Sequence, residues 1–156
     1  METHTRIWEA NVLMEEYRQL LADTQIDALP LVVSGSSMTP FLVPGRDTVF
    51  LARLQESVKR GQILLYQRDS GAYILHRVYK VRQNTFTMVG DAQTSLEPGI
   101  RPDQVIAVVT KVNRNGKMQS HGCFWWEFFE KIWIRMVPLR PMMRSVYAAF
   151  RKLWKG

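Results

Sequence analysis

Residues 61–81 read GQILLYQRDSGAYILHRVYKV, two apolar runs separated by the polar residues RDSG. Runs rich in aliphatic and aromatic residues, bounded by Gly, Asp and Ser, are typical of β-strands. In the second run a side-chain period of two places His76 on the same face as Ile74 and Val78. The sequence therefore predicts two strands here, with His76 pointing towards the buried side of a sheet.

The same pattern of short apolar runs bounded by turn residues extends in both directions, from residue 31 to residue 120. Further apolar runs read TVFLARL, TFTMV and QVIAVVTKV, and NRNG at 113–116 has the composition of a hairpin connection. No helix of useful length fits between these runs, which disfavours a parallel βαβ architecture. We therefore predict a single, mainly-β domain at residues 28–121.

Helices are predicted at both ends of the chain. Between residues 5 and 22, apolar side chains recur at three- and four-residue spacing, which predicts an amphipathic helix packed on the domain, within a unit of residues 1–27. The apolar positions are Ala10, Leu13, Met14, Tyr17, Leu20 and Leu21. Residues 122–156 form the third unit, in which Pro138 and Pro141 should divide an amphipathic helical tail into two pieces.

The composition is that of an ordinary globular chain. With 156 residues, 46% hydrophobic and 22% charged, the chain is about one domain long and can bury a core. Its single cysteine, Cys123, excludes an internal disulfide framework and a multi-cysteine zinc site. Acidic residues stand where a signal peptide requires a positive start, and no uncharged apolar run reaches the ~20 residues of a membrane-spanning helix. We expect synthesis in the cytoplasm without an export signal.

The formal charge of +7 is concentrated in the tail. Residues 124–156 hold seven basic and two acidic residues, a net charge of +5, together with four of the five tryptophans. Aromatic side chains on one helical face and Lys or Arg on the other are typical of helices that lie in a bilayer interface. We expect a peripheral membrane protein at the cytoplasmic face, bound to an anionic membrane surface through residues 124–156. Packing of the tail on the β domain or on a partner is the alternative; no nucleic acid is expected, because the tail is too apolar for a solvated binding stripe.

The stretch SGSSMTP, residues 34–40, could contain a catalytic serine. A turn of small residues lets backbone N–H groups converge on one point, as a developing oxyanion requires, and a serine at its end can present a hydroxyl there. A serine hydroxyl also needs a base. Among the histidines His4, His76 and His121, only His76 lies inside an apolar strand, and imidazole is the natural proton acceptor for serine. A simple loop and a packed core histidine remain the alternatives.

Two further assignments remain open on these grounds. Lys80 shares the face of His76 and is a rival base, but four strand residues separate the two by roughly 13 Å, so both cannot contact one hydroxyl. A carboxylate usually orients such a histidine, and Asp91 in a Gly-Asp turn and Glu97 are available. Asp91 could also serve only to form the turn.

Four segments together resemble the ordered boxes of the signal peptidase I and self-cleaving-repressor superfamily of serine peptidases. They read VSGSSMTPFLVPGRDTVFL, GQILLYQRDSGAYILHRVYKV, TFTMVGDAQ and PDQVIAVVTKV, and the resemblance covers roughly residues 30–113. It implies a signal-peptidase-like β domain with Ser37 as nucleophile, His76 as base and Asp91 as the residue that orients it. Glu97 is the second acidic residue. With His at the base position, the chain is similar to the Ser–His signal peptidases of the archaeal and endoplasmic-reticulum type.

The sequence departs from this superfamily in three places. In PGRDTV one residue separates the Gly and Asp that are usually adjacent, which should only alter a turn. Gly35 stands where bacterial-type enzymes often have a serine, so the oxyanion hole should rely on the Ser37 backbone N–H, with Ser36 or Ser34 as further candidates. The N-terminal transmembrane anchor of the signal peptidases has no counterpart in these residues.

The resemblance implies a serine endopeptidase that cleaves a peptide or preprotein near the membrane through a Ser37 acyl-enzyme, with no metal and no cofactor. One alternative is a non-catalytic member of the fold that binds peptides or membrane. Another is an autoproteolytic regulator, which would carry a Lys base and an N-terminal DNA-binding domain too large for the roughly 30 residues before the sheet. The sequence does not fix the oligomeric state.

Overall fold

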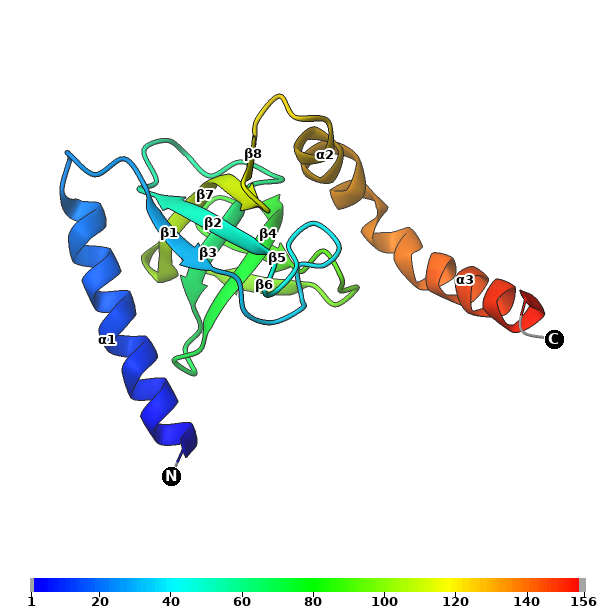
Figure 1. Cartoon of the computed structure of the whole chain (residues 1–156), viewed down its shortest axis with the longest axis horizontal. Helices are drawn as coiled ribbons and strands as arrows, with labels where there is room; N and C mark the ends of the chain where they lie inside the picture. The colour runs from blue at the N-terminus through cyan, green and yellow to red at the C-terminus, as the bar shows by residue number, and fades with distance from the viewer. Residues whose placement is uncertain (1, 155–156) are drawn as a thin grey trace.

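The computed structural model describes the backbone of residues 2–154 and the side chains of residues 10–149. Eight antiparallel strands form one sheet in the order β1-β2-β7-β3-β4-β5-β6, and β8 pairs with the later part of β7 (Figure 1). The strands are β1 (Leu29–Val32), β2 (Asp47–Ala52), β3 (Ile63–Gln67), β4 (Tyr73–Val81), β5 (Phe86–Val89), β6 (Glu97–Ile100), β7 (Val105–Arg114) and β8 (Lys117–Ser120). The prediction of a mainly-β domain is confirmed, and its sheet is antiparallel.

The β3–β4 hairpin places two polar side chains on opposite faces of the sheet. In its register His76 lies opposite Leu64, and Arg77 lies opposite Ile63. Because successive side chains of a strand point to opposite faces, His76 enters one apolar cluster and Arg77 the other. His76 is only 3% exposed, as the period-two pattern predicted. Its cluster contains Val58, Leu64, Tyr66, Val78, Phe86, Met88, Ile100 and Val108.

Two connections show what local sequence can and cannot indicate. Asn115 and Gly116, with φ of 50° and 81°, join β7 to β8, as NRNG predicted, and positive φ at both positions is typical of a type I′ hairpin turn. Strand β6, in contrast, was not predicted. Its four residues include Pro98 and Gly99, which lie at an irregularity between Glu97 and Ile100, the residues that pair with β5, on an edge strand where proline is tolerated.

The N-terminal helix α1 (Glu2–Ala22) lies beside β1 (Figure 1). Met14 and Leu21 are buried in the main core, but Leu13 and Leu20 are more than 40% exposed. The predicted helix is therefore confirmed. Only some of its apolar side chains pack on the sheet, and the others are exposed.

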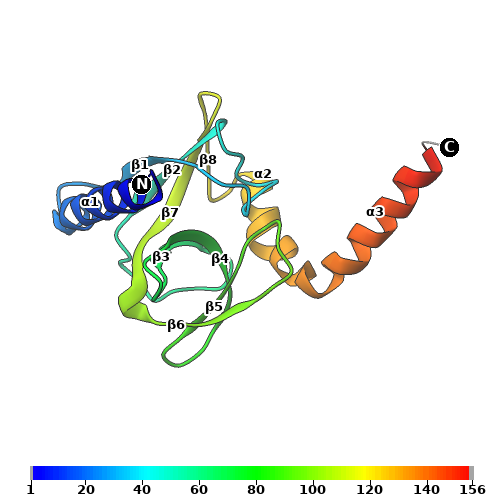
Figure 2. The same ribbon diagram turned by 90° about the horizontal axis from the view of Figure 1, so that it is seen from below.

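The C-terminal region does not form a single projecting tail. It consists of α2 (Phe124–Glu127), the short helical turns η2 (Phe128–Ile132) and η3 (Trp133–Leu139), and α3 (Arg140–Trp154). Trp126 and Phe129 are buried in the main core, where both rings contact Phe41. Ile134 and Val137 are also buried. The predicted unit of residues 122–156 is thus divided: residues 124–140 complete the core of the β domain, and the rest of α3 leads away from it (Figure 2).

Close approach of two backbones explains part of this packing. A Cβ atom at Gly61 would lie 2.5 Å from the backbone oxygen of Glu130 in η2, so only glycine fits there. Within the described part of the chain, no helix has both the length and the apolar content required to cross a lipid bilayer.

Candidate active site

The turn that contains Ser37 leaves strand β1 and reverses within a few residues. Gly35 has a φ of 81°, a conformation that favours glycine. The carbonyl oxygen of Ser36 accepts hydrogen bonds from the Thr39 backbone N–H at 3.1 Å and from its hydroxyl at 2.8 Å. Among the described residues, the backbone N–H groups of residues 35–38 donate to no other protein group. These N–H groups are therefore available to an acceptor beside the turn.

The Ser37 turn is fixed against the Gly90-Asp91 turn that follows β5. The Ala92 backbone N–H donates to the Ser37 carbonyl oxygen at 2.9 Å. A Cβ atom at Gly90 would lie 2.5 Å from the same oxygen, so a side chain there would separate the two turns. Two motifs that are more than 50 residues apart in the sequence are thus brought into direct contact.

Asp91 does not orient His76 in this structure. Both of its carboxylate oxygens accept hydrogen bonds from the Arg77 guanidinium, at 2.9 and 2.8 Å, and both residues are 1% exposed. Arg77 also donates to the Gly61 carbonyl oxygen at 2.8 Å. The expectation that Asp91 orients the base is therefore corrected. Both oxygens of the Asp91 carboxylate are used in a buried, bidentate ion pair with Arg77, which joins β4 to the loop that contains Ala92.

Glu97 takes the place that Asp91 was expected to fill. Its Oε2 atom accepts a hydrogen bond from the Tyr66 hydroxyl at 2.7 Å, and that hydroxyl lies 3.3 Å from His76 Nδ1. Arg68 holds the same carboxylate from its outer side, with contacts of 2.6 and 2.8 Å. Four side chains from β3, its following turn, β4 and β6 thus form one continuous network.

The donors in this network determine the tautomer of His76. Burial and the neighbouring Glu97 carboxylate raise the pKa of Tyr66, so its hydroxyl keeps its proton and donates it to Glu97. The tyrosine oxygen can then only accept from His76 Nδ1–H. It follows that Nε2 carries the free lone pair, which is the nitrogen that can act as a base.

The charge state of His76 also suits a base. Burial lowers the pKa of His76 to about 4, against an opposing effect of Glu97. The imidazole is therefore neutral at pH 7, and its separation of 3.9 Å from Glu97 is not an ion pair in this state. Hydrogen bonds from Arg68 hold the pKa of Glu97 below its ordinary value, so this carboxylate is ionised and can stabilise an imidazolium when one forms.

The structure joins the Ser37 turn to His76 only indirectly. The Ser37 carbonyl oxygen accepts from Ala92, and Asp91 beside Ala92 binds Arg77. Arg77 follows His76 in β4 and points to the opposite face of the sheet. Within the described residues no hydrogen bond joins the Ser37 hydroxyl to His76, and such contacts often tighten only when substrate binds.

The other candidate bases lie outside this network. Lys80 is exposed near the end of β4, and His121 has a side chain that is 62% exposed. The side chain of His4 lies outside the described residues. His121, Glu127 and Glu130 bring three possible metal ligands within 4.8 Å of one another. Glu127 is paired with the Lys131 ammonium group, and Glu130 accepts a hydrogen bond from the Trp126 indole, so both carboxylates already have partners.

Sequence reasoning missed the residues that support the site. Tyr66 could have been found from the sequence. The period of two along β3 places it on the same face as Leu64, and Leu64 is the residue that pairs with His76. Trp133 and Arg140 carried no such signal. The Trp133 indole donates to the Asp91 carbonyl oxygen at 3.0 Å. The buried Arg140 donates to the carbonyl oxygens of Gly90 and Gln93 at 2.9 and 2.7 Å, so the C-terminal segment holds the loop that contacts Ser37.

An apolar groove of about 710 Å³ leads towards the Ser37 turn. It lies between α1, β1 and the β3–β4 hairpin, and its lining reaches Ser34. The lining residues are Ala10, Asn11, Leu13, Met14, Tyr17, Pro30, Leu31, Val32, Val33, Ser34, Leu65, Gly71, Ala72, Tyr73 and Leu75. Strand β1 is at the edge of the sheet, with β2 as its neighbour. A second, polar hollow of about 470 Å³ lies beside Glu97 and Arg68.

Comparison with known proteins adds no assignment to this geometry. No known protein-family model matches the chain, and no curated protein is significantly similar to it in sequence.

Proposed function

We propose that the protein is a serine endopeptidase that cleaves a peptide or preprotein through an acyl-enzyme on Ser37, with His76 as the general base. The observation that carries this proposal is the Glu97–Tyr66–His76 network. It supplies a neutral imidazole whose Nδ1–H is engaged and whose Nε2 is free, which is the state a serine nucleophile requires.

The first half of the reaction forms the acyl-enzyme. His76 Nε2 accepts the proton of the Ser37 hydroxyl as its oxygen bonds to the carbonyl carbon of the substrate. The unused N–H groups of residues 35–38 stabilise the oxyanion, and the ionised Glu97 stabilises the imidazolium. The peptide C–N bond then breaks, and the leaving nitrogen takes the proton from His76.

The second half returns the enzyme to its starting state. Water bonds to the acyl carbon as it gives a proton to His76, and the bond to the Ser37 oxygen breaks. That oxygen takes the proton back, and the carboxylic acid product leaves. Protons and electron pairs balance over the cycle without a metal or a cofactor.

The groove supports a peptide as the substrate. An extended peptide can lie beside the edge strand β1 and place side chains in the apolar groove, although Pro30 offers no N–H and its carbonyl oxygen accepts from the Tyr17 hydroxyl. β1 runs into the Ser37 turn, and the lining of the groove reaches Ser34 at the start of that turn. A signal-peptidase-like β domain is the arrangement that these features and the ordered sequence motifs favour.

The proposed activity is tested by the protein N-termini in cells that produce the wild-type chain or the Ser37→Ala variant. We expect a defined set of N-termini that disappears with Ser37→Ala and is kept by the neighbouring substitution Ser36→Ala. Identical N-termini in all three strains would contradict the proposal.

A further inference from the structure

Helix α3 presents an uncovered apolar face. Residues 141–149 are all exposed, and the helix leads away from the sheet (Figures 1 and 2). We define the α3 apolar face as Met142, Met143, Val146 and Tyr147, whose residue exposures are 61%, 39%, 62% and 72%. Their spacing of three and four residues places them on one side of the helix.

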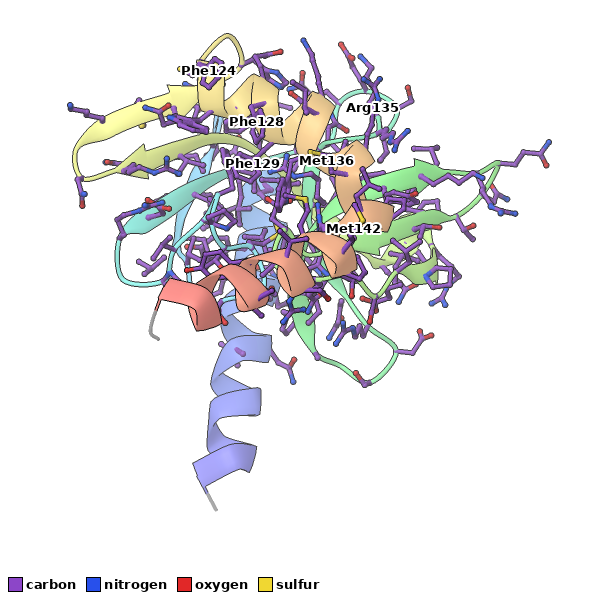
Figure 3. All side chains as sticks on the ribbon, turned by 90° about the vertical axis from the view of Figure 1, so that its right-hand side faces the viewer. Phe124, Phe128, Phe129, Arg135, Met136 and Met142 are labelled. Atoms are coloured by element: carbon purple, nitrogen blue, oxygen red, sulfur yellow. The ribbon has the colours of Figure 1, made fainter. Side chains whose placement is uncertain are left out.

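The start of α3 is attached to the domain through two arginines. At its start Arg140 is buried and bonded to the loop at Gly90 and Gln93. Arg144, one turn later, lines the polar hollow formed with residues 92–98. Arg140 and Arg144 thus face the loop, and helical spacing places Met142 and Val146 on the opposite side of α3. Figure 3 shows Met142 below Phe124, Phe128 and Met136 along the helical segment.

An isolated helix of 15 residues with such a face is only marginally stable in water, so an apolar surface should cover it. Charge selects the kind of surface. Residues 141–156 contain four basic residues, Arg144, Arg151, Lys152 and Lys155, and no acidic residue. Two copies of α3 packed face to face would repel each other, whereas an anionic lipid surface attracts this segment by about 1 kcal/mol for each basic residue near it.

We propose that α3 docks in the interface of an anionic lipid bilayer through its apolar face. The helix is about 22 Å long, too short to span the hydrocarbon layer but suited to lie in the plane of the headgroups. The adjoining Arg140 contacts then hold the Gly90–Gln93 loop at a fixed position relative to the membrane. This docking does not depend on the peptidase activity, because the α3 apolar face contributes no residue to the Ser37 network.

The test is sedimentation of the full chain with vesicles of phosphatidylcholine alone or of phosphatidylcholine and phosphatidylglycerol, at low and high salt. We expect binding to the anionic vesicles that weakens as salt rises. Met142→Asp with Val146→Asp should reduce that binding about tenfold or more. The control, Ser145→Asp with Ala148→Asp, adds the same charge to the other side of α3 and should retain more of it.

Three results would overturn the proposal. The first is no binding of the full chain to anionic vesicles at low salt. The second is an equal loss for the two double variants when circular dichroism shows both to be folded, since charge alone would then explain the effect. The third is a stable dimer in sedimentation velocity that Met142→Asp with Val146→Asp converts to a monomer, which would identify a second copy as the cover.

Discussion

The Tyr66 hydroxyl lies 3.3 Å from His76 Nδ1 and donates its own proton to Glu97. This relationship ties the tautomer of a buried histidine to a carboxylate that the histidine does not contact directly. Replacing Tyr66 with Phe removes one oxygen and leaves the apolar ring in the core. We expect Tyr66→Phe to remain folded and to lose about 10- to 100-fold in kcat/KM, because His76 loses the acceptor that fixes Nδ1–H.

Nuclear magnetic resonance of ¹⁵N-labelled histidine reports the tautomer directly. The wild-type protein should show His76 protonated on Nδ1, and Tyr66→Phe should show a mixture. Full activity of a folded Tyr66→Phe protein would show that this hydroxyl does not matter for the reaction.

The pH dependence follows from the burial of His76. A base with a pKa of about 4 is active in its neutral form, so activity should rise through a step near pH 4 and be level by pH 6. An exposed histidine would give the step at the 6–7 expected from an ordinary imidazole. Initial rates of peptide cleavage from pH 3.5 to pH 8 measure this, and a step near 6.5 would contradict the buried, neutral base.

The same shift gives folding stability a defined pH dependence. The pKa of His76 in the folded state is below its unfolded value of about 6.5, so the unfolded chain binds the proton more readily. Stability present above pH 6.5 is therefore lost as pH falls towards 4, by an amount on the order of 3 kcal/mol. Urea unfolding at each pH measures this loss. It also identifies the pH range in which the protein is folded and cleavage rates can be compared. His76→Gln should make the free energy of unfolding less dependent on pH.

The two carboxylates should respond differently to neutralisation. Asp91→Asn breaks a buried ion pair and should lower the free energy of unfolding by about 3–5 kcal/mol, because Arg77 is left without its partner. Glu97 is less buried than Asp91, and glutamine has nearly the same shape as glutamate. Glu97→Gln should leave most of the stability but lower kcat and shift the activity step below pH 4, since the charge that favours the imidazolium is gone. The opposite pattern would return the orienting role to Asp91.

Truncation separates the part of the C-terminal region that belongs to the core. A chain ending before Phe124 lacks Trp126 and Phe129, each of which should contribute about 3–5 kcal/mol. We expect this chain not to fold. A chain ending after residue 140 keeps these side chains and should show cooperative thermal unfolding. Folding of the shorter chain would show that the buried aromatic residues are dispensable.

The sequence predicted those strands whose apolar and polar residues alternate and whose ends are marked by nearby turn residues. The faces of β4 followed from period two, and Asn115-Gly116 identified a hairpin. Strand β6 was not predicted, because Pro98 and Gly99 interrupt it between Glu97 and Ile100, the two residues that pair with β5.

The same limit applies to the candidate site. Ser37 and His76 carry local signals, but the partner of each carboxylate depends on which strands become neighbours. Asp91 was expected beside His76, and Arg77, the next residue along β4, binds it on the opposite face of the sheet. For the C-terminal segment the amphipathic pattern was visible, yet an apolar face is equally suited to a core and to a membrane. Only the packing of Trp126 and Phe129 on Phe41 distinguishes the two.

The central claim is that Ser37 is a nucleophile activated by His76. Incubation with a fluorophosphonate, followed by peptide mapping in a mass spectrometer, tests it most directly, because the reagent bonds to an activated serine hydroxyl. We predict one adduct, on Ser37, that is absent in Ser37→Ala, strongly reduced in His76→Ala and kept in Lys80→Ala. An adduct on Ser36 or Ser34, or no difference between wild type and His76→Ala, would contradict the account.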